Sequence, residues 1–306
     1  MAARKMRGDD GRQSHMFGGS WTEQKLDTVS SYLQAYVTAL KKTPFDTMYI
    51  DAFAGSGYVD PPSEPDESDD QLYFPELAAP EPRQFLEGSV RRALRTQPPF
   101  GKYLFIERSA KRAAELESLK TEFAALADRI DVRTGDANEV VQQVCRNGQW
   151  KGRRGVLFLD PYGMQVDWAT LEAAAATRAL DTWILLPHAI GVGRTLPKSG
   201  KVPKSWRRTL TRFLGTDAWE NDLYTVTETT NLLGAVERIE RASVDRIGEY
   251  ILTRLRTIFA AVERPAILRN SKGTPLYMLV FAVNSDSAKG QEIATRIASH
   301  LLKEHY

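Results

Sequence analysis

Four acidic residues stand where four short apolar runs of the sequence end. Asp51, Glu107 and Asp160 each close such a run, and Asp136 follows a fourth in the segment Gly135-Asp136-Ala137-Asn138. Runs of this kind predict buried parallel strands, and open α/β sheets bind their ligands beyond the carboxyl ends of the strands. We expect Asp51 to face a cationic group, Glu107 to accept hydrogen bonds from two ribose hydroxyls, and Asp136 to accept one from an adenine amino group. The pattern predicts a nucleoside-containing cofactor.

The turn after Asp51 favours one such cofactor over another. Gly55 and Gly57 allow backbone N–H groups to approach a ligand closely. A dinucleotide site needs a third glycine and a helix N-terminus for the pyrophosphate, but Asp60 stands at that third position and repels an anion. We therefore expect S-adenosylmethionine. Its expected contacts are Asp51, Phe53, Gly55, Gly57, Glu107, Arg108, Asp136, Ala137 and Asp160.

The segment Asp160-Pro161-Tyr162-Gly163 indicates the reaction. It is similar to the (Asp/Asn)-Pro-Pro-(Tyr/Phe) box of amino-methyltransferases, although the second proline is absent, and closer still to the Asp-Pro-(Phe/Tyr)-Gly box of tRNA guanine N2-methyltransferases. We expect Asp160 and the Pro161 carbonyl to hold an exocyclic amine, and Tyr162 to stack on the base. The bland alternative is a strand end followed by a proline-shaped turn. Carbon-5 cytosine methylation is disfavoured, because the single cysteine, Cys145, lies in a helical stretch well before this loop.

A stretch rich in cations and free of acids follows the predicted fifth strand, at Thr195–Arg212. Such a stretch predicts either a solvated loop or a phosphate-binding arm. Lys25, on the first predicted helix, is a further candidate for a cofactor carboxylate or a substrate phosphate, with a solvated helix lysine as the alternative. The expected substrate-binding residues are Lys25, Lys198, Lys201, Lys204, Trp206, Arg207 and Arg208.

Helical and strand patterns alternate along most of the chain. Five short strands, the first at 48–53 and the fifth at 182–186, alternate with helices, which predicts a doubly wound, mostly parallel α/β sheet. Residues 266–269 and 275–283 flank the turn Ser271-Lys272-Gly273 and predict a C-terminal antiparallel hairpin. Residues 1–19 read as a flexible tail. Residues 20–306 read as one domain, with an acidic insertion at 58–86 and a basic helical insertion at 191–262.

Together these motifs resemble the class I methyltransferases. More narrowly, Trp21-Thr22 with Lys25, Asp51-Ala-Phe-Ala-Gly-Ser-Gly57, Gly135-Asp-Ala-Asn138 and Asp160-Pro-Tyr-Gly163 resemble the bacterial three-Cys-motif partner family. The resemblance runs from about residue 20 to the C-terminus and includes Tyr277–Ala282. It implies a seven-stranded, Rossmann-like class I methyltransferase sheet and a separate radical-type partner protein that carries the cysteine motif. It implies no particular substrate.

Composition narrows the remaining alternatives. The chain has 306 residues, a net charge of +2, one cysteine and no apolar run long enough for a membrane span. We expect a cytoplasmic protein that has neither an internal disulfide nor a metal site built from cysteines. The leading hypothesis is an amino-directed methyltransferase acting on nucleic acid (DNA or RNA) or a nucleotide-like substrate. Two others are a cofactor-binding partner subunit that catalyses nothing alone, and a small-molecule methyltransferase.

Overall fold

The computed structural model describes residues 21–56, 88–231, 234–270 and 272–304, and for 228–237 it describes the backbone alone. Gly57 and the acidic insertion at 58–86 therefore lie outside the described residues, as does the tail at 1–19. The helices are α1 (Trp21–Leu40), α2 (Ser89–Leu94), α3 (Ala110–Glu122), α4 (Ala137–Asn147), α5 (Trp168–Ala176), α6 (Gly193–Thr195), α7 (Lys204–Leu214), α8 (Trp219–Asp222), α9 (Val244–Leu255) and α10 (Ala288–Glu304), with a 3₁₀ turn at Ala124–Arg129 and a π-helical turn at His188–Val192. The strands are β1 (Asp46–Asp51), β2 (Lys102–Glu107), β3 (Ile130–Thr134), β4 (Arg153–Leu159), β5 (Leu180–Leu186), β6 (Tyr224–Asn231), β7 (Gly234–Arg241), β8 (Ala261–Val262), β9 (Ala266–Arg269) and β10 (Pro275–Val283).

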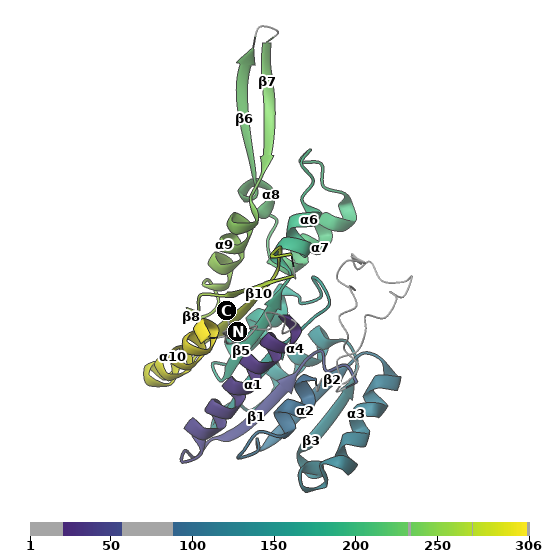
Figure 1. Cartoon of the computed structure of the whole chain (residues 1–306), viewed down its shortest axis with the longest axis vertical. Coiled ribbons are helices and arrows are strands. Elements are labelled where there is room, and N and C mark those ends of the chain that lie inside the picture. Colours follow the sequence, from purple (N-terminus) through teal and green to yellow (C-terminus); the bar gives the residue numbers. More distant parts are fainter. Residues whose placement is uncertain (1–20, 57–87, 232–233, 271, 305–306) are drawn as a thin grey trace, which may run out of the picture.

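One mostly parallel sheet forms the centre of the molecule (Figure 1). Its strands run in the order β3-β2-β1-β4-β5-β10-β8, and β9 pairs with β10 beside this path. The five strands from β3 to β5 are parallel, whereas β10 is antiparallel to β5, β8 and β9. The predicted doubly wound sheet and its C-terminal antiparallel hairpin are confirmed. The sheet has eight strands in the described residues where seven were expected, and β8 contributes only two residues.

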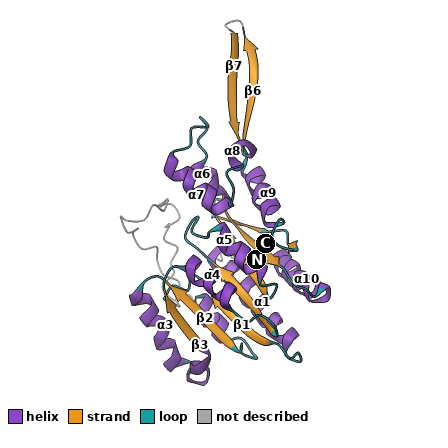
Figure 2. Cartoon of the chain, turned by 180° about the vertical axis from the view of Figure 1, so that it is seen from behind, coloured by secondary structure: helices purple, strands orange, loops and turns teal. Residues whose placement is uncertain are grey.

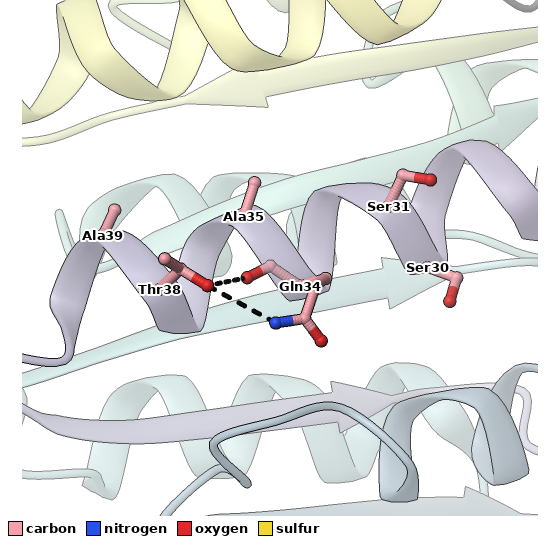
Figure 3. A pocket seen from close by; sticks show the side chains of 6 residues that line it. All are labelled: Ser30, Ser31, Gln34, Ala35, Thr38 and Ala39. Carbon is pink, nitrogen blue, oxygen red and sulfur yellow. Dashed lines mark hydrogen bonds between the residues drawn. The ribbon is translucent and has the colours of Figure 1, made fainter.

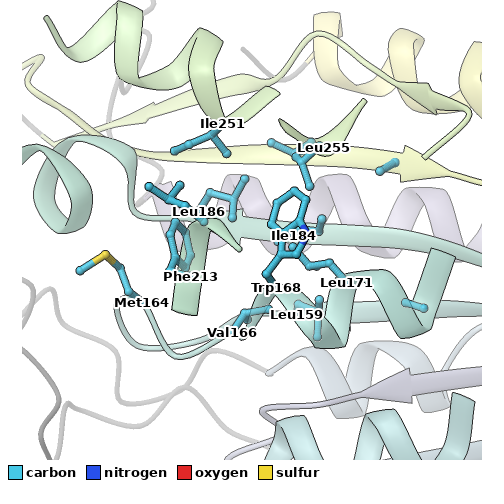
Figure 4. Close-up of a cluster of buried hydrophobic side chains, with 14 of the residues drawn as sticks. Leu159, Met164, Val166, Trp168, Leu171, Ile184, Leu186, Phe213, Ile251 and Leu255 are labelled. Carbon is cyan, nitrogen blue, oxygen red and sulfur yellow. The ribbon is translucent and has the colours of Figure 1, made fainter. Parts of the chain in front are cut away.

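Side chains alternate between two apolar layers because successive residues of a strand point to opposite faces. On β5, Trp183 and Leu185 pack with α1, α2, α3 and α10, whereas Ile184 and Leu186 pack with α4, α5, α7 and α9. Figure 4 shows the second layer, in which Trp168 of α5 and Phe213 of α7 lie close to Ile184. Helices therefore cover both faces of the sheet. Ligands are left with the edge at which the parallel strands end.

An antiparallel hairpin of β6 and β7 stands apart from this sheet (Figures 1 and 2). Sequence reasoning expected a helical insertion at 191–262, so the prediction is wrong for Tyr224–Asn231 and Gly234–Arg241. The helices on either side were predicted, at about 205–214 and 241–262, and are observed as α7 and α9. The missed signal is the run of β-branched residues in Thr225-Val226-Thr227, a composition typical of strands.

Candidate active site

The strand order brings the four predicted acids to one edge of the sheet. β1 lies between β2 and β4, and Asp51 is in register with Phe105 of β2 and with Phe158 of β4. Glu107 ends β2 beside Thr134 of β3. Asp160 comes directly after β4, and Asp136 comes two residues after β3. The four carboxylates therefore line the carboxyl edge of four adjacent strands.

Asp51 is held in a dry and fixed position. Its side chain is fully buried, Oδ1 accepts from the Phe53 N–H (3.3 Å), and Oδ2 accepts from the Tyr49 hydroxyl (3.2 Å). Burial raises the pKa of Asp51 to about 6; a hydrogen bond with Ser89 opposes this rise, and the charge of Asp160 adds to it. A desolvated carboxylate beside a second one attracts a cation. This environment suits an ammonium or sulfonium group.

The turn after Asp51 is pinned to the neighbouring strands. Ala52 N–H donates to the Phe158 carbonyl (3.1 Å), and Ala54 N–H donates to the Ile106 carbonyl (3.0 Å). Gly55 has φ of +62°, a conformation that residues with a Cβ rarely adopt. The main chain can therefore turn sharply at the edge of the sheet, as predicted from the glycine.

The two acids next along the edge differ in how they are held. Glu107 is buried, and its Oε1 accepts from the Ser109 N–H (2.8 Å), which leaves Oε2 for a ligand. Asp136 is exposed, and its Oδ1 accepts from Asn138 N–H (2.9 Å) and Glu139 N–H (3.1 Å) at the start of α4. Asp136 is thus the N-cap of a helix as well as a candidate cofactor ligand. The remaining predicted cofactor residues flank these positions, with Phe53 partly buried, Arg108 exposed and Ala137 buried.

Lys25 forms an ion pair with Asp160 that sequence reasoning missed. Its Nζ contacts Asp160 Oδ2, although 135 residues separate the two along the chain. The Lys25 side chain is 5% exposed and that of Asp160 is 22% exposed, so the alternative of a solvated helix lysine is wrong. The ammonium also lies 5.6 Å from the Trp21 ring centre and 6.0 Å from that of Phe158. It offsets the repulsion between Asp160 and Asp51 and fixes the orientation of the Asp160 carboxylate.

Asn138 holds the loop that follows Asp160. Its side-chain N–H donates to the Gln165 carbonyl (2.8 Å), and its Oδ1 accepts from Asp167 N–H (2.9 Å) and from the Thr170 hydroxyl (2.8 Å). This loop contains Gly163 at φ +70° and leaves Tyr162 53% exposed. Asn138 therefore connects the Gly135–Asn138 and Asp160–Gly163 motifs and fixes their positions relative to each other.

The basic residues lie beyond the end of β5. Lys198, Lys201 and Lys204 are exposed, as are Arg207 and Arg208, and Trp206 is half-buried. Arg207 pairs with Glu220 across an exposed surface (3.3 Å). No described contact joins this group to Asp160. The group follows the end of β5 and forms an exposed basic surface there.

The β6–β7 hairpin is tied to the same region at its base. Arg241 donates to the carbonyls of Gly193 (2.8 Å) and Leu196 (3.0 Å), and the Tyr224 hydroxyl donates to the Pro197 carbonyl (2.9 Å). Val226 is 59% exposed and stands directly opposite Ile239, which is 39% exposed. With Tyr162 these are the large apolar side chains that stay exposed in the described part of the chain. The hairpin thus carries an apolar pair on a surface that sequence reasoning did not find.

Two other features do not belong to the site. His188, in the π-helical turn after β5, is 3% exposed, and burial lowers its pKa to about 4, so it is neutral at pH 7. A shallow pocket on α1 is lined by small or uncharged side chains (Figure 3). None of them is an acid, a base or an activated nucleophile. They are Ser30, Ser31, Gln34, Ala35, Thr38 and Ala39.

Comparison with known proteins concerns the fold. No family model and no curated protein matches the sequence. A structure of protein LPL1258 from Legionella pneumophila, described by the family model DUF519, aligns with a TM-score of 0.50 at 13% identity, over 95% of this chain and 94% of that one. An O-methyltransferase from Bacillus cereus in complex with SAH aligns at 0.33 and 18% identity, over 74% and 91%. Spermidine synthase from Thermotoga maritima aligns at 0.36 and 11% identity, over 87% and 60%.

The chain has a doubly wound, mostly parallel α/β fold in which the antiparallel strand β10 lies next to β5. At these identities the comparisons concern architecture alone. No helix in the described ranges is both long and apolar enough to cross a membrane.

Proposed function

We propose that this protein is an S-adenosylmethionine-dependent methyltransferase that methylates an exocyclic amine of a nucleic-acid base or nucleotide-like substrate. The observation that carries the proposal is the buried ion pair between Lys25 and Asp160 at the carboxyl edge. A buried lysine charge lowers the stability of a protein unless it is paired. Its pairing with Asp160 fixes the orientation of a partly exposed carboxylate at the carboxyl edge, where a ligand would bind.

The residues at the edge fit the cofactor. Asp51 would hold the methionine ammonium, Glu107 Oε2 would accept from the ribose hydroxyls, and Asp136 Oδ2 would accept from the adenine amino group. Gly55 gives the main chain a close approach. When bound, S-adenosylmethionine supplies a methyl group on a cationic sulfur that leaves as a neutral thioether.

The chain's own residues would act on the amine. Because Lys25 occupies Asp160 Oδ2, the second oxygen, Oδ1, is left to accept one amine N–H, and the Pro161 carbonyl accepts the other. Two acceptors draw the nitrogen toward tetrahedral geometry and direct its lone pair at the methyl carbon. On methylation the nitrogen would lose one proton, which Asp160 Oδ1, already hydrogen-bonded to that N–H, would accept. Tyr162, exposed on the adjoining loop, is positioned to cover the base.

The nucleic-acid part of the proposal rests on the exposed cations of Lys198–Arg208 next to this edge. Lysine and arginine side chains that neutralise phosphates release counterions, which gives sequence-independent affinity. Nucleic acid therefore fits this surface better than a small uncharged substrate does.

A second candidate function is that of a cofactor-binding subunit that works with a protein partner. The exposed Val226–Ile239 pair on the hairpin favours it, since apolar side chains on a projecting surface commonly mark protein contacts. The resemblance to the three-Cys-motif partner family implies a radical-type protein in that role. In this case the same pocket would bind the cofactor without transferring its methyl group unaided.

Two measurements separate these functions. Calorimetric titration tests whether the full chain binds S-adenosylmethionine, and the absence of heat at millimolar cofactor contradicts both. Incubation with methyl-labelled cofactor and total nucleic acid, followed by nucleoside analysis, tests transfer. Label in an N-methylated nucleoside supports the first function. Cofactor binding without methyl transfer supports the second function, provided that transfer begins when the partner protein is added.

A further inference from the structure

Trp21 contacts Lys25, which pairs with the proposed catalytic carboxylate, although the motif that contains Trp21 gives it no role. It begins the described part of α1 and is half-buried. Its ring centre lies 5.1 Å from that of Tyr277, with 31° between the ring planes. Tyr277 belongs to β10 and is 4% exposed, so the indole rests on a rigid, buried support. Trp21 is therefore an aromatic side chain whose position is set in advance.

Lys25 links this indole to Asp160. The ammonium that pairs with Asp160 lies 5.6 Å from the Trp21 ring centre, one helical turn away on α1. A cation over an aromatic face is attracted to it, most strongly where water is excluded. The contacts run without a break from Asp160 through Lys25 and Trp21 to Tyr277. A planar group held by its amine at Asp160 would lie within reach of the indole.

Trp21 and Tyr162 have different properties as supports for such a group. Tyr162 is 53% exposed on a loop, whereas Trp21 is half-buried against Tyr277. Because Trp21 packs against Tyr277, its side-chain conformational entropy is already lost in the folded protein. A rigid aromatic surface gains more from stacking than a mobile one.

We propose that Trp21 is a substrate-binding residue that forms an aromatic wall for the planar ring of the methyl acceptor, facing the Asp160 acceptor. The inference rests on the proposed function and deepens it, because it requires a substrate with a flat, π-bonded ring. Base–aromatic stacking is worth about 1–3 kcal/mol per base, which corresponds to a rise in KM of at least about fivefold when the ring is removed.

The test compares Trp21→Phe and Trp21→Leu in the full chain, with Trp150→Leu as the matched control. Trp150 is also half-buried, but it precedes β4 and so lies at the opposite edge of the sheet. KM is measured with the nucleic-acid fraction that the wild-type protein labels, and the dissociation constant of S-adenosylmethionine is measured by calorimetry. We expect Trp21→Leu to raise KM about tenfold and Trp21→Phe about twofold, with cofactor affinity unchanged in both and KM unchanged in the control.

The outcomes distinguish this inference from the proposed function. If the wild-type protein labels nothing, the proposed function fails and takes the inference with it. If the wild-type protein transfers methyl and folded Trp21→Leu keeps the wild-type KM, the aromatic wall alone is overturned. Should Trp21→Leu not fold, Trp21→Phe decides, because a wild-type KM in that variant also overturns the inference. An equal rise in KM in the Trp150 control would assign the effect to general loosening and overturn it as well.

Discussion

Replacing Asp51 by asparagine should make the protein more stable and less able to bind its cofactor. The Asp51 carboxyl is fully buried, and burial, opposed by Ser89 and reinforced by Asp160, raises its pKa to about 6 from an ordinary value near 3.8. Asparagine keeps an oxygen that accepts from the Phe53 N–H, its amide NH2 can donate to the Tyr49 hydroxyl oxygen, and the buried charge is removed. The variant therefore removes a destabilising charge while it preserves the shape of the site.

The size and pH dependence of the effect follow from linkage. A folded pKa above the unfolded one means that the folded state binds the proton more tightly, so this carboxyl destabilises the fold as pH rises through the interval from about 4 to 6. The difference of about 2 pKa units corresponds to about 3 kcal/mol above pH 7, falling to about 1.6 kcal/mol at pH 5. For a chain of 306 residues, 3 kcal/mol is a shift in Tm of about 5 °C.

The assay is urea unfolding of wild type and Asp51→Asn at pH 8 and pH 5. We expect the variant to be more stable by about 3 kcal/mol at pH 8 and by about half of that at pH 5. Calorimetry should show weaker binding of S-adenosylmethionine. Asp136→Asn is the control, because Asp136 is exposed and asparagine is also a good N-cap. A gain that is equal at both pH values, or absent, would refute the reasoning.

Three further predictions address the rest of the site and its surroundings. Asp160→Ala should lower kcat about 100-fold or more while cofactor affinity changes little, and stopped-time label transfer with calorimetry checks both; an unchanged kcat removes Asp160 from the mechanism. Lys201→Glu combined with Lys204→Glu should weaken nucleic-acid binding and flatten the slope of log K against log salt concentration by about one unit per lost phosphate contact, whereas Lys289→Glu on α10 should change neither. Anisotropy titrations at several salt concentrations measure this slope. Equal slopes for the wild type and the double variant would contradict the proposed surface. Arg241→Ala should cost about 1–3 kcal/mol and accelerate hydrogen exchange in β6 and β7 while β1 and β4 stay protected, so a uniform change throughout the sheet would contradict the anchoring role.

The sheet was predictable from local patterns, whereas its contacts were not. The predicted strands at 266–269 and 275–283 match β9 and β10, and the predicted strand at 182–186 lies within β5 (Leu180–Leu186), because buried strands carry unbroken apolar runs. The β6–β7 hairpin was missed because its described side chains at 225–227 and 238–241 are exposed, so the alternation of buried and exposed residues that marks a half-buried strand is lacking there. The Lys25–Asp160 pair could not be inferred either, since it depends on how α1 packs against β4 across 135 residues.

The β6–β7 hairpin is a long arm that is fixed at its base. Each strand has eight residues, so the arm is about 26 Å long at about 3.3 Å per residue. At the base, the Arg241 guanidinium donates hydrogen bonds to the Gly193 and Leu196 carbonyls, just after the π-helical turn that follows β5. β5 pairs with β4, which Asp160 follows directly, so the base of the arm and the acceptor belong to neighbouring strand ends of one sheet.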